Sequence, residues 1–304
     1  MRKLFIFGLC LALVMVFGSF EVMAQEELAE VDTLLTTYLA RVQDNPVVQL
    51  GNKAQMWYVE ENMVEGTEYE DLPVISTNAV WRGGVGDDPD WFAHVEDAIT
   101  DENLEEIYRF DNTIFVLKLD GEQVIDWLEF TAEGNFNQID PDDDSDQFLV
   151  NEEFDDYMHD HFEGIEYQYD VTQPEGERVV YAEYNGEPLD EDMEFLVASN
   201  NHRATGGGSV PHAVEENVVL TTETENREAI VDYLNERDGE VPELTLNWSL
   251  APVETEGNVL FETSPRVEEY LEVAPEPVDH IGIVGAFGGF SIVSYDLSVG
   301  NLGN

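Results

Sequence analysis

Two short stretches of the chain place aromatic, amide and glycine residues where they could hold a flat ligand. Residues 108–113 contain Phe110 and Asn112, and residues 199–208 contain His202 and end in three consecutive glycines. Aromatic rings stack on a nucleobase with about 1 to 3 kcal/mol per base, and a few polar groups then fix its orientation. Phe110 and His202 could therefore form the two walls of a base-binding slot.

Each stretch also has an interpretation without a ligand. Phe110 could be an ordinary core residue, and residues 206–208 could form a simple turn, because glycine adopts positive φ angles at little cost. The same freedom lets a glycine backbone approach a ligand closely. The residue types alone leave both interpretations open.

Two other segments have the composition of metal sites. His159-Asp160-His161 places two imidazoles close together, and residues 140–146 supply five carboxylates. A calcium loop needs glycine at its sixth position and glutamate at its twelfth, where this segment has Ser145 and Asn151. We therefore expect residues 140–146 to form a solvated acidic loop. No Ser-His-Asp arrangement or phosphate-binding loop in the sequence suggests another catalytic centre.

Acidic residues far outnumber basic ones. The 67 Asp and Glu face 12 Lys and Arg, which gives a formal net charge of −55. With 43% hydrophobic and 11% aromatic residues, the chain still has enough apolar area for a folded core. Because about 1 M salt shortens the screening length to roughly 3 Å, the even spread of acid favours adaptation to high salt. Nucleic acid is not expected as a partner, since phosphate backbones require a basic face.

The N-terminal residues have the three-part layout of a secretory signal peptide. Arg2 and Lys3 precede an apolar run over residues 4–17, and Ala24 ends a segment suited to cleavage. Cys10, the only cysteine, lies inside this run, and a lipid-modified Cys10 is the weaker alternative. No later run reaches the roughly 18 to 20 apolar residues that spanning needs. We expect a periplasmic or extracellular product that leaves the membrane after cleavage.

Hydrophobic periodicity predicts an α+β fold. Helices are expected over residues 26–42, 47–63, 122–130 and 226–235, and strands over residues 107–119, 165–171, 179–184 and 195–199. Residues 72–76 are expected to form at most a short strand, and residues 82–89 a loop. Asn185-Gly186 predicts a hairpin turn, and residues 257–304 are rich in glycine, valine and aromatics, as edge strands are.

Other segments share the pattern of one known family. The matching segments are residues 47–60, 136–139, 167–168, 170–174, 184–188 and 247–248. Together with residues 108–113 and 199–208, they resemble the C-terminal, substrate-binding domain of the bacterial 5'-nucleotidase family over roughly residues 40–270. Within that family they are most similar to the 2',3'-cyclic-nucleotide 2'-phosphodiesterase/3'-nucleotidase branch.

The resemblance implies that two aromatics sandwich a nucleobase. The substrate-binding residues that it implies are Phe110, Asn112, His202, Arg203, Gly206, Gly207 and Gly208. His202 stands where the family usually has tyrosine or phenylalanine, which weakens stacking and makes it sensitive to protonation. Gly208 stands where the 5'-nucleotidase branch has a ribose-binding aspartate. Any phosphate contacts would use Arg82 or Arg203, the basic residues nearest the glycine loops.

Enzymes of this family also contain a metallophosphatase domain, whose Asp-x-His, Asn-His-Asp/Glu and His-x-His sets hold two metals that activate water. None of the six histidines here follows that order, and His159-Asp160-His161 falls in a segment whose counterpart binds no catalytic metal. The resemblance therefore implies no catalytic residue and no metal or other cofactor in this chain. Divalent metals would enter only with a separately encoded metallophosphatase domain as partner.

These observations combine into one expectation. A signal peptide covers residues 1–24, a nucleotide-binding domain of mixed sheet and flanking helices covers residues 25–256, and a β-rich extension over residues 257–304 packs on the same domain. The expected function is the nucleotide- or nucleoside-binding half of a secreted nucleotidase or cyclic-nucleotide phosphodiesterase, acting in nucleotide catabolism. Turnover by this chain is left open. The alternatives are a stand-alone exported nucleoside-binding protein and a degenerate surface domain.

Overall fold

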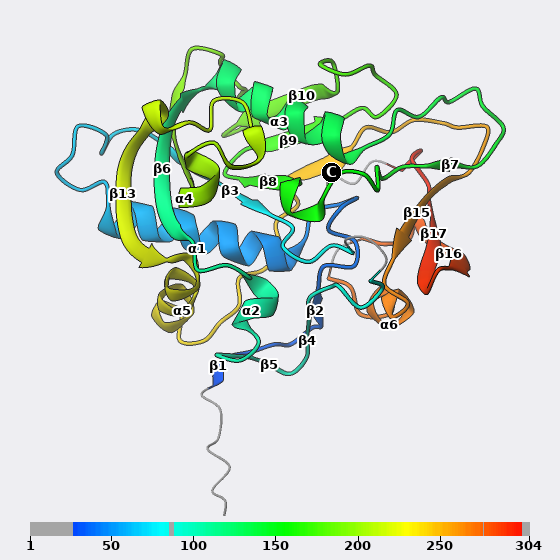
Figure 1. Cartoon of the computed structure of the whole chain (residues 1–304), viewed down its shortest axis with the longest axis horizontal. Helices are drawn as coiled ribbons and strands as arrows, with labels where there is room; N and C mark the ends of the chain where they lie inside the picture. The colour runs from blue at the N-terminus through cyan, green and yellow to red at the C-terminus, as the bar shows by residue number, and fades with distance from the viewer. Residues whose placement is uncertain (1–26, 85–87, 276, 300–304) are drawn as a thin grey trace, which may run out of the picture.

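A mixed five-stranded sheet forms the centre of the molecule. The computed structural model describes residues 27–84, 88–275 and 277–299, so the expected signal peptide and Cys10 lie outside the described residues. In sheet order the strands are β13 (Val218–Glu225), β6 (Thr113–Asp120), β12 (Glu194–Asn200), β3 (Val74–Ala79) and β8 (Asp160–Glu163). Helix α1 (Pro46–Asn62) packs against β3, β8 and β12 (Figure 1). The fold is α+β, as the sequence predicts.

The local sequence explains why α1 begins where it does. The Asn45 side chain accepts hydrogen bonds from the N–H groups of Val47 and Val48, at 3.0 and 3.4 Å, and Pro46 occupies the first helical position. Gly51 then lets the helix approach β3, because a Cβ there would lie 2.2 Å from Nδ2 of Asn78. The helix predicted over residues 47–63 is confirmed.

The strand directions bring four chain segments to one end of this sheet. β12 runs antiparallel to β6 with Asn200 opposite Ile114, and parallel to β3. β8 runs antiparallel to β3 with Asp160 opposite Ala79. The ends of β3 and β12 therefore lie beside the starts of β6 and β8. The residues that follow or precede these four strand ends must gather there.

A second layer covers the sheet with α3 (Gly121–Asn135) and another sheet. That sheet has the order β11 (Glu187–Pro188), β10 (Val179–Tyr184), β9 (Glu166–Tyr169) and β14 (Trp248–Leu250). Asp120 and Gln123 form a capping box that begins α3 directly after β6. Asn185 and Gly186 join β10 to β11 with φ angles of 53° and 77°, which confirms the predicted hairpin turn.

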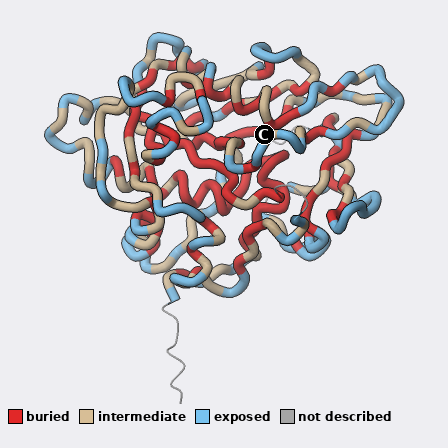
Figure 2. The backbone as a smooth tube through the Cα atoms, viewed as in Figure 1, coloured by how far each residue is buried: buried red, intermediate tan, exposed pale blue. Residues whose placement is uncertain are grey.

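The C-terminal segment completes a third sheet. Its order is β16 (Ile281–Phe287), β17 (Phe290–Tyr295), β15 (Val259–Thr263) and β7 (Gln147–Phe148), with α6 (Val267–Leu271) between β15 and β16. β15 pairs in parallel with β7, which lies far earlier in the chain. Phe261 and Val293 belong to the same buried cluster as Trp127 of α3, and Figure 2 shows this buried interior continuing across the molecule.

Three expected elements differ from the structure. The helix predicted over residues 26–42 is wrong: β1 (Glu27–Glu30) pairs with β5 (Ala98–Thr100), and β2 (Leu35–Thr36) pairs with β4 (His94–Val95). Residues 104–107 form the short helix α2, so the strand predicted over residues 107–119 begins only at Thr113. β3 is longer than the short strand expected over residues 72–76. Residues 85–87 of the expected loop lie outside the described residues.

The physical reason for the missing first helix lies in its threonines. Thr36 and Thr37 are β-branched, which disfavours a helix and suits extended chain. The Thr37 hydroxyl accepts a hydrogen bond from the Ala93 N–H at 2.9 Å and donates one to the Arg82 carbonyl, so it crosslinks this segment to two others. Helix α5 (Asn226–Glu236), by contrast, matches its prediction closely.

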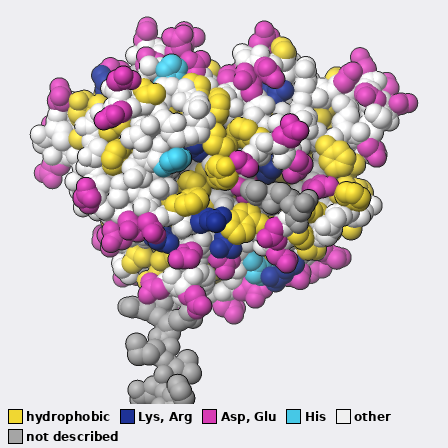
Figure 3. Space-filling view, viewed as in Figure 1, with side chains coloured by type: hydrophobic (Ala, Val, Ile, Leu, Met, Phe, Trp, Pro, Cys, Tyr) yellow, Lys and Arg dark blue, Asp and Glu magenta, His cyan; other side chains and the backbone are white. Residues whose placement is uncertain are grey.

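The outer surface is acidic on many elements. Figure 3 shows Asp and Glu side chains spread over the whole visible face, with hydrophobic side chains between them near its middle. No helix within residues 27–84, 88–275 and 277–299 is long and apolar enough to cross a bilayer.

Candidate functional site

The sheet end where four segments gather carries a cavity of about 700 Å³. Each segment contributes to its lining. The lining includes Trp81 after β3, Phe110 and Asn112 before β6, Tyr157 and Met158 before β8, and Asn200, His202, Arg203 and Gly208 after β12. The structure thus brings Phe110, Asn112, His202, Arg203 and Gly208 to one cavity, although the first two residues lie far from the other three in the sequence.

Phe110 is not a core residue. Its side chain is 42% exposed, and its ring packs edge-on against buried Trp81, with centroids 5.4 Å apart at 77°. Trp81 is itself fixed, because its indole N–H donates to Oδ1 of Asn78 at 2.9 Å and its ring lies 4.9 Å from that of Tyr108. A rigid aromatic base therefore supports a ring whose other surface is open to the cavity.

His202 lies on the short helix α4 (Asn201–Ala204), which directly follows β12. Asn200 begins this helix by accepting a hydrogen bond from the Arg203 N–H at 2.9 Å. His202 is exposed, and Gly207 packs beneath it so closely that a Cβ there would lie 2.4 Å from the imidazole. The glycine at this position therefore makes room for the ring.

The rest of the glycine loop is shaped by tight packing. Gly206 and Gly208 have φ angles of 97° and 80°, which favour glycine. A Cβ on Gly208 would lie 2.3 Å from Nη1 of Arg203 and 2.6 Å from the Met158 side chain. Gly208 lines the cavity, whereas Gly206 and Gly207 shape the loop without belonging to the lining.

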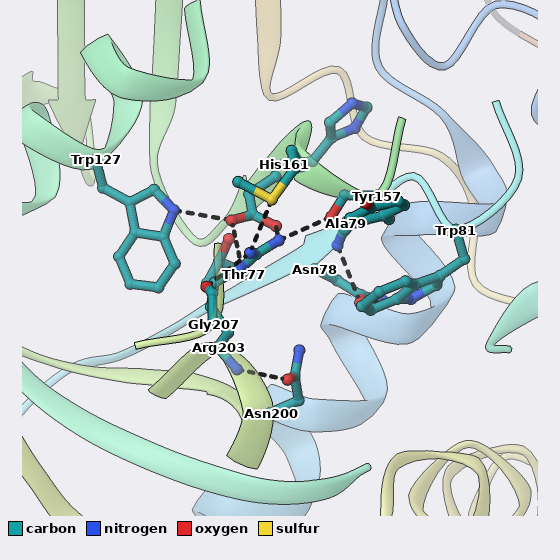
Figure 4. Close-up of polar contacts among 12 residues, drawn as sticks. Thr77, Asn78, Ala79, Trp81, Trp127, Tyr157, His161, Asn200, Arg203 and Gly207 are labelled. Atoms are coloured by element: carbon teal, nitrogen blue, oxygen red, sulfur yellow. Dashed lines mark hydrogen bonds and ion pairs between the residues drawn. The ribbon is translucent and has the colours of Figure 1, made fainter. Parts of the chain in front are cut away.

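Arg203 holds the glycine loop in place through a buried ion pair. Its Nε lies 3.0 Å from Oδ2 of Asp160, and the two side chains are only 4% and 3% exposed. Nη2 donates to Oδ1 of Asp160 at 3.1 Å and to the Tyr157 carbonyl at 2.8 Å, while Nη1 donates to the Gly207 carbonyl at 3.0 Å (Figure 4). The guanidinium is thus bonded to protein groups, which gives Arg203 a positioning role in the glycine loop.

Asp160 is the other half of this arrangement. Burial raises the pKa of its carboxyl group, while the Arg203 guanidinium and the Trp127 indole N–H, which donates to Oδ2 at 2.9 Å, favour the ionised form. Figure 4 shows Arg203 directed from the loop toward Trp127 and Tyr157. The pair therefore connects β8, α3 and the glycine loop.

Asn112 supplies an amide at the cavity. Its main-chain carbonyl accepts hydrogen bonds from the main-chain and side-chain N–H groups of Asn226, at 2.9 and 3.0 Å. These bonds fix the backbone where α5 begins, and the Asn112 side chain lines the cavity beside Phe110. A side-chain amide can both donate to and accept from the edge of a base.

Sequence reasoning missed several residues around the cavity. Trp81 and Tyr157 line it, and Arg109 and Trp91 line a smaller cavity of about 210 Å³ that also touches Phe110. One signal was available: Arg109 directly precedes Phe110 in a chain with only 12 Lys and Arg. Trp81 and Tyr157 reach the cavity only through the pairing of their strands, and no local pattern in the sequence marks them.

The histidine pair that resembles a metal motif lies in the core. The His161 Nε2 donates to the Ala40 carbonyl at 2.8 Å, and the Trp248 indole donates to Nδ1 at 3.3 Å. Burial lowers the pKa of His161 to about 3 and that of His159 well below its usual 6.5. The ring of His159 packs against those of Phe136, His161 and Trp248. No cluster of three or more potential ligands for a metal occurs among the described residues.

Replacing His159 by phenylalanine is expected to reduce the acid sensitivity of folding. The His159 imidazole titrates near 6.5 in the unfolded chain, whereas burial lowers its pKa in the folded chain. The contribution of neutral His159 to the free energy of unfolding is therefore complete above pH 6.5, and it is lost as the pH falls toward the lower folded pKa. Between pH 7 and pH 5, one such histidine lowers the free energy of unfolding of the wild type by about 2 kcal/mol. Urea unfolding at both pH values, in constant KCl, measures this. Equal losses in wild type and His159→Phe would contradict the prediction.

Comparisons with known proteins identify the family of this chain. A model of the family described as "5'-nucleotidase, C-terminal domain" matches residues 28–215. The "Trifunctional nucleotide phosphoesterase protein YfkN" of Bacillus subtilis is 36% identical over 264 residues, covering 83% of this chain and 18% of that protein. The "2',3'-cyclic-nucleotide 2'-phosphodiesterase/3'-nucleotidase" of Haemophilus influenzae is 35% identical over 288 residues, covering 86% of this chain and 43% of that protein. This chain spans less than half the length of these relatives.

Solved structures show the same fold at lower identity. A 5'-nucleotidase precursor from Thermus thermophilus superimposes with a TM-score of 0.57 at 21% identity, covering 74% of this chain and 39% of that chain. A putative 5'-nucleotidase from Staphylococcus aureus gives the same TM-score at 20% identity, covering 74% of this chain and 41% of that chain.

Proposed function

Because this chain belongs to the family of 5'-nucleotidase C-terminal domains, we propose that it is the nucleotide- or nucleoside-binding half of an exported nucleotidase or cyclic-nucleotide phosphodiesterase. One observation carries the proposal. The exposed ring of Phe110, supported by Trp81, and the imidazole of His202, supported by Gly207, line the same cavity at the end of the central sheet. This arrangement supports a slot for a flat base between two rings.

The residues of this chain would bind and orient the substrate. Phe110 and His202 would stack on the base, and the Asn112 amide would hydrogen-bond its edge. The main chain of Gly208, which lines the cavity, would lie against the ribose. In the proposal, a separately encoded metallophosphatase domain supplies the metals that activate water. The binding half then contributes to the rate by positioning the ester.

A calorimetric titration tests this function. The chain from residue 25 onward is titrated with adenosine and 3'-AMP in about 1 M KCl with Mn²⁺, and the same samples are assayed for released phosphate. We expect binding of both ligands without release. Release would contradict the assignment of this chain as a binding half, and absence of binding would contradict the slot.

A second step distinguishes a binding half from a stand-alone binding protein. The metallophosphatase domain of a relative such as the Haemophilus influenzae protein is added in trans to the same samples. Release of phosphate that depends on both proteins is expected if this chain presents substrate to a catalytic partner. Binding that never leads to release would favour a stand-alone nucleoside-binding protein.

We also propose that the protein is exported and adapted to high salt. The acidic surface and the layout of residues 1–24 support this. Raising KCl from about 0.2 to 2 M is expected to increase the melting temperature by several degrees, because screening reduces repulsion among the carboxylates. Differential scanning calorimetry measures this, and sucrose at equal osmolality controls for general solute exclusion. An equal effect of sucrose would contradict the electrostatic explanation.

A further inference from the structure

Two arginines lie over one tryptophan beside the candidate slot. The guanidinium carbon of Arg109 is 4.3 Å from the centroid of the Trp91 ring, and that of Arg82 is 4.8 Å from it. The Arg109 guanidinium also lies 5.3 Å from the centroid of Phe110. Cation–π contacts hold these groups flat at about 0.5 to 1 kcal/mol each at an exposed site. Arg109 is thus fixed next to the ring expected to stack on a base, and Arg82 lies over the same tryptophan.

The two arginines over Trp91 form no ion pair among the described residues, and Nε of Arg82 is buried without a hydrogen bond. Three other basic residues of the described chain also form no ion pair, but their side chains donate hydrogen bonds to main-chain carbonyls: Lys53, Arg178 and Arg237. The two arginines over Trp91 have no such bond among the described residues. Five other basic residues do pair with carboxylates: Arg41, Lys118, Arg203, Arg227 and Arg266. With 67 Asp and Glu in the chain, positive groups held on an aromatic ring are available for an anion from outside.

Two carboxylates near Arg109 accept hydrogen bonds from main-chain N–H groups. Asp88 and Asp156 line the same small cavity as Arg109. Asp88 accepts a hydrogen bond from the Asp90 N–H at 3.1 Å, and Asp156 accepts hydrogen bonds from the N–H groups of Gly83 and Tyr157 at 2.5 and 2.7 Å. These main-chain bonds hold Asp88 within its own loop and tie Asp156 to the segment at Gly83.

The small cavity shares three lining residues with the larger one. Both are lined by Trp81, Phe110 and Tyr157, and the smaller one, of about 210 Å³, adds Arg109 and Trp91. A ligand whose base stacks on Phe110 could therefore extend its ribose substituent toward Arg109. In molar salt the screening length is roughly 3 Å, so the acidic surface neither repels nor steers an anion from a distance. Recognition of a phosphate then depends on direct contacts.

We propose that Arg109, together with Arg82 and Trp91, forms an anion subsite that binds the phosphoryl group of a nucleotide held in the slot. The guanidinium fork binds phosphate oxygens in a bidentate manner, and its contact with Trp91 fixes its plane before binding. Arg109 thereby determines a preference for nucleotides over nucleosides. The proposal rests on the proposed function, since the base slot places the phosphate. Arg203 is less suited to this role because its Nη atoms already donate to Asp160 and to main-chain carbonyls.

The test compares the affinities of 3'-AMP and adenosine in wild type, Arg109→Gln and Arg109→Lys. Calorimetry in about 1 M KCl gives the ratio of the two affinities for each protein. We expect wild type to bind 3'-AMP more tightly than adenosine. In Arg109→Gln the ratio of the two affinities should fall about tenfold. Arg109→Lys should recover only part of it, because lysine keeps the charge without the planar fork. Arg266→Gln, which alters an exposed ion-paired arginine outside both cavities, should keep the wild-type ratio.

The outcomes separate this subsite from the slot itself. If wild type binds adenosine and 3'-AMP equally, or if Arg109→Gln keeps the wild-type ratio, the subsite is overturned while the nucleoside slot stands. If wild type binds neither ligand, both proposals fail. Circular dichroism establishes that each variant is folded, which is expected because the Arg109 side chain is exposed.

Discussion

Replacing Asp160 by alanine is expected to lower the free energy of unfolding by about 3 to 5 kcal/mol, because Arg203 would remain buried without its counter-charge. The change also removes the acceptor for the Trp127 indole N–H. Urea unfolding in constant KCl measures the loss. The matched control is Asp126→Ala, which breaks an exposed pair with His212 and should cost about 1 kcal/mol or less.

A double variant shows whether the loss comes from the unpaired charge. Asp160→Leu combined with Arg203→Met removes both ionic groups, and we expect it to recover a large part of the stability that Asp160→Ala loses. A loss under about 1 kcal/mol in Asp160→Ala would mean that the ion pair does not hold the loop. A double variant as unstable as Asp160→Ala would point to lost packing.

Replacing Phe110 by alanine is expected to weaken adenosine binding by about tenfold to a hundredfold, which corresponds to the roughly 1 to 3 kcal/mol of one stacking contact. Folding should change little, because the side chain is 42% exposed. Calorimetric titration with adenosine measures the affinity, and thermal unfolding measures the stability of the same protein.

The chain offers a matched control for this substitution. Phe148 has a similar exposure, 44%, and lies on β7 outside both cavities, so Phe148→Ala should leave adenosine affinity unchanged. If Phe110→Ala binds adenosine as well as wild type does, the slot is not formed by this ring. If both variants weaken binding equally, the effect is on the fold.

The sequence predicted correctly those elements whose ends are marked by capping or turn residues. Asn45-Pro46 specifies the start of α1, and Asn185-Gly186 specifies the turn between β10 and β11. The apolar spacing of residues 26–42 fits a helix, which made the prediction for this segment wrong. In the structure the segment is extended, because β1 pairs with β5 and β2 pairs with β4. That pairing is a long-range interaction, which periodicity cannot report.

The same distinction applies to the candidate site. The types of Phe110 and His202 marked them as possible stacking groups, but their approach depends on the antiparallel register of β6 and β12. The sequence offers Arg203 as a phosphate contact, but it does not show the ion pair with Asp160 from another strand. A lone arginine before an aromatic residue matches no motif, so the sequence does not mark Arg109; its contact with the ring of Trp91 appears only in the fold.

The buried Arg203–Asp160 pair makes the shape of the slot independent of ionic strength. Surface pairs such as Lys118–Glu194 weaken as salt rises, but a pair only 3% to 4% exposed is hardly reached by counterions. A change in the salt concentration around the protein would change the fraction of molecules that are folded. The molecules that stay folded would keep the same loop geometry, so the ligand meets one site across the whole range of salinity in which the protein survives.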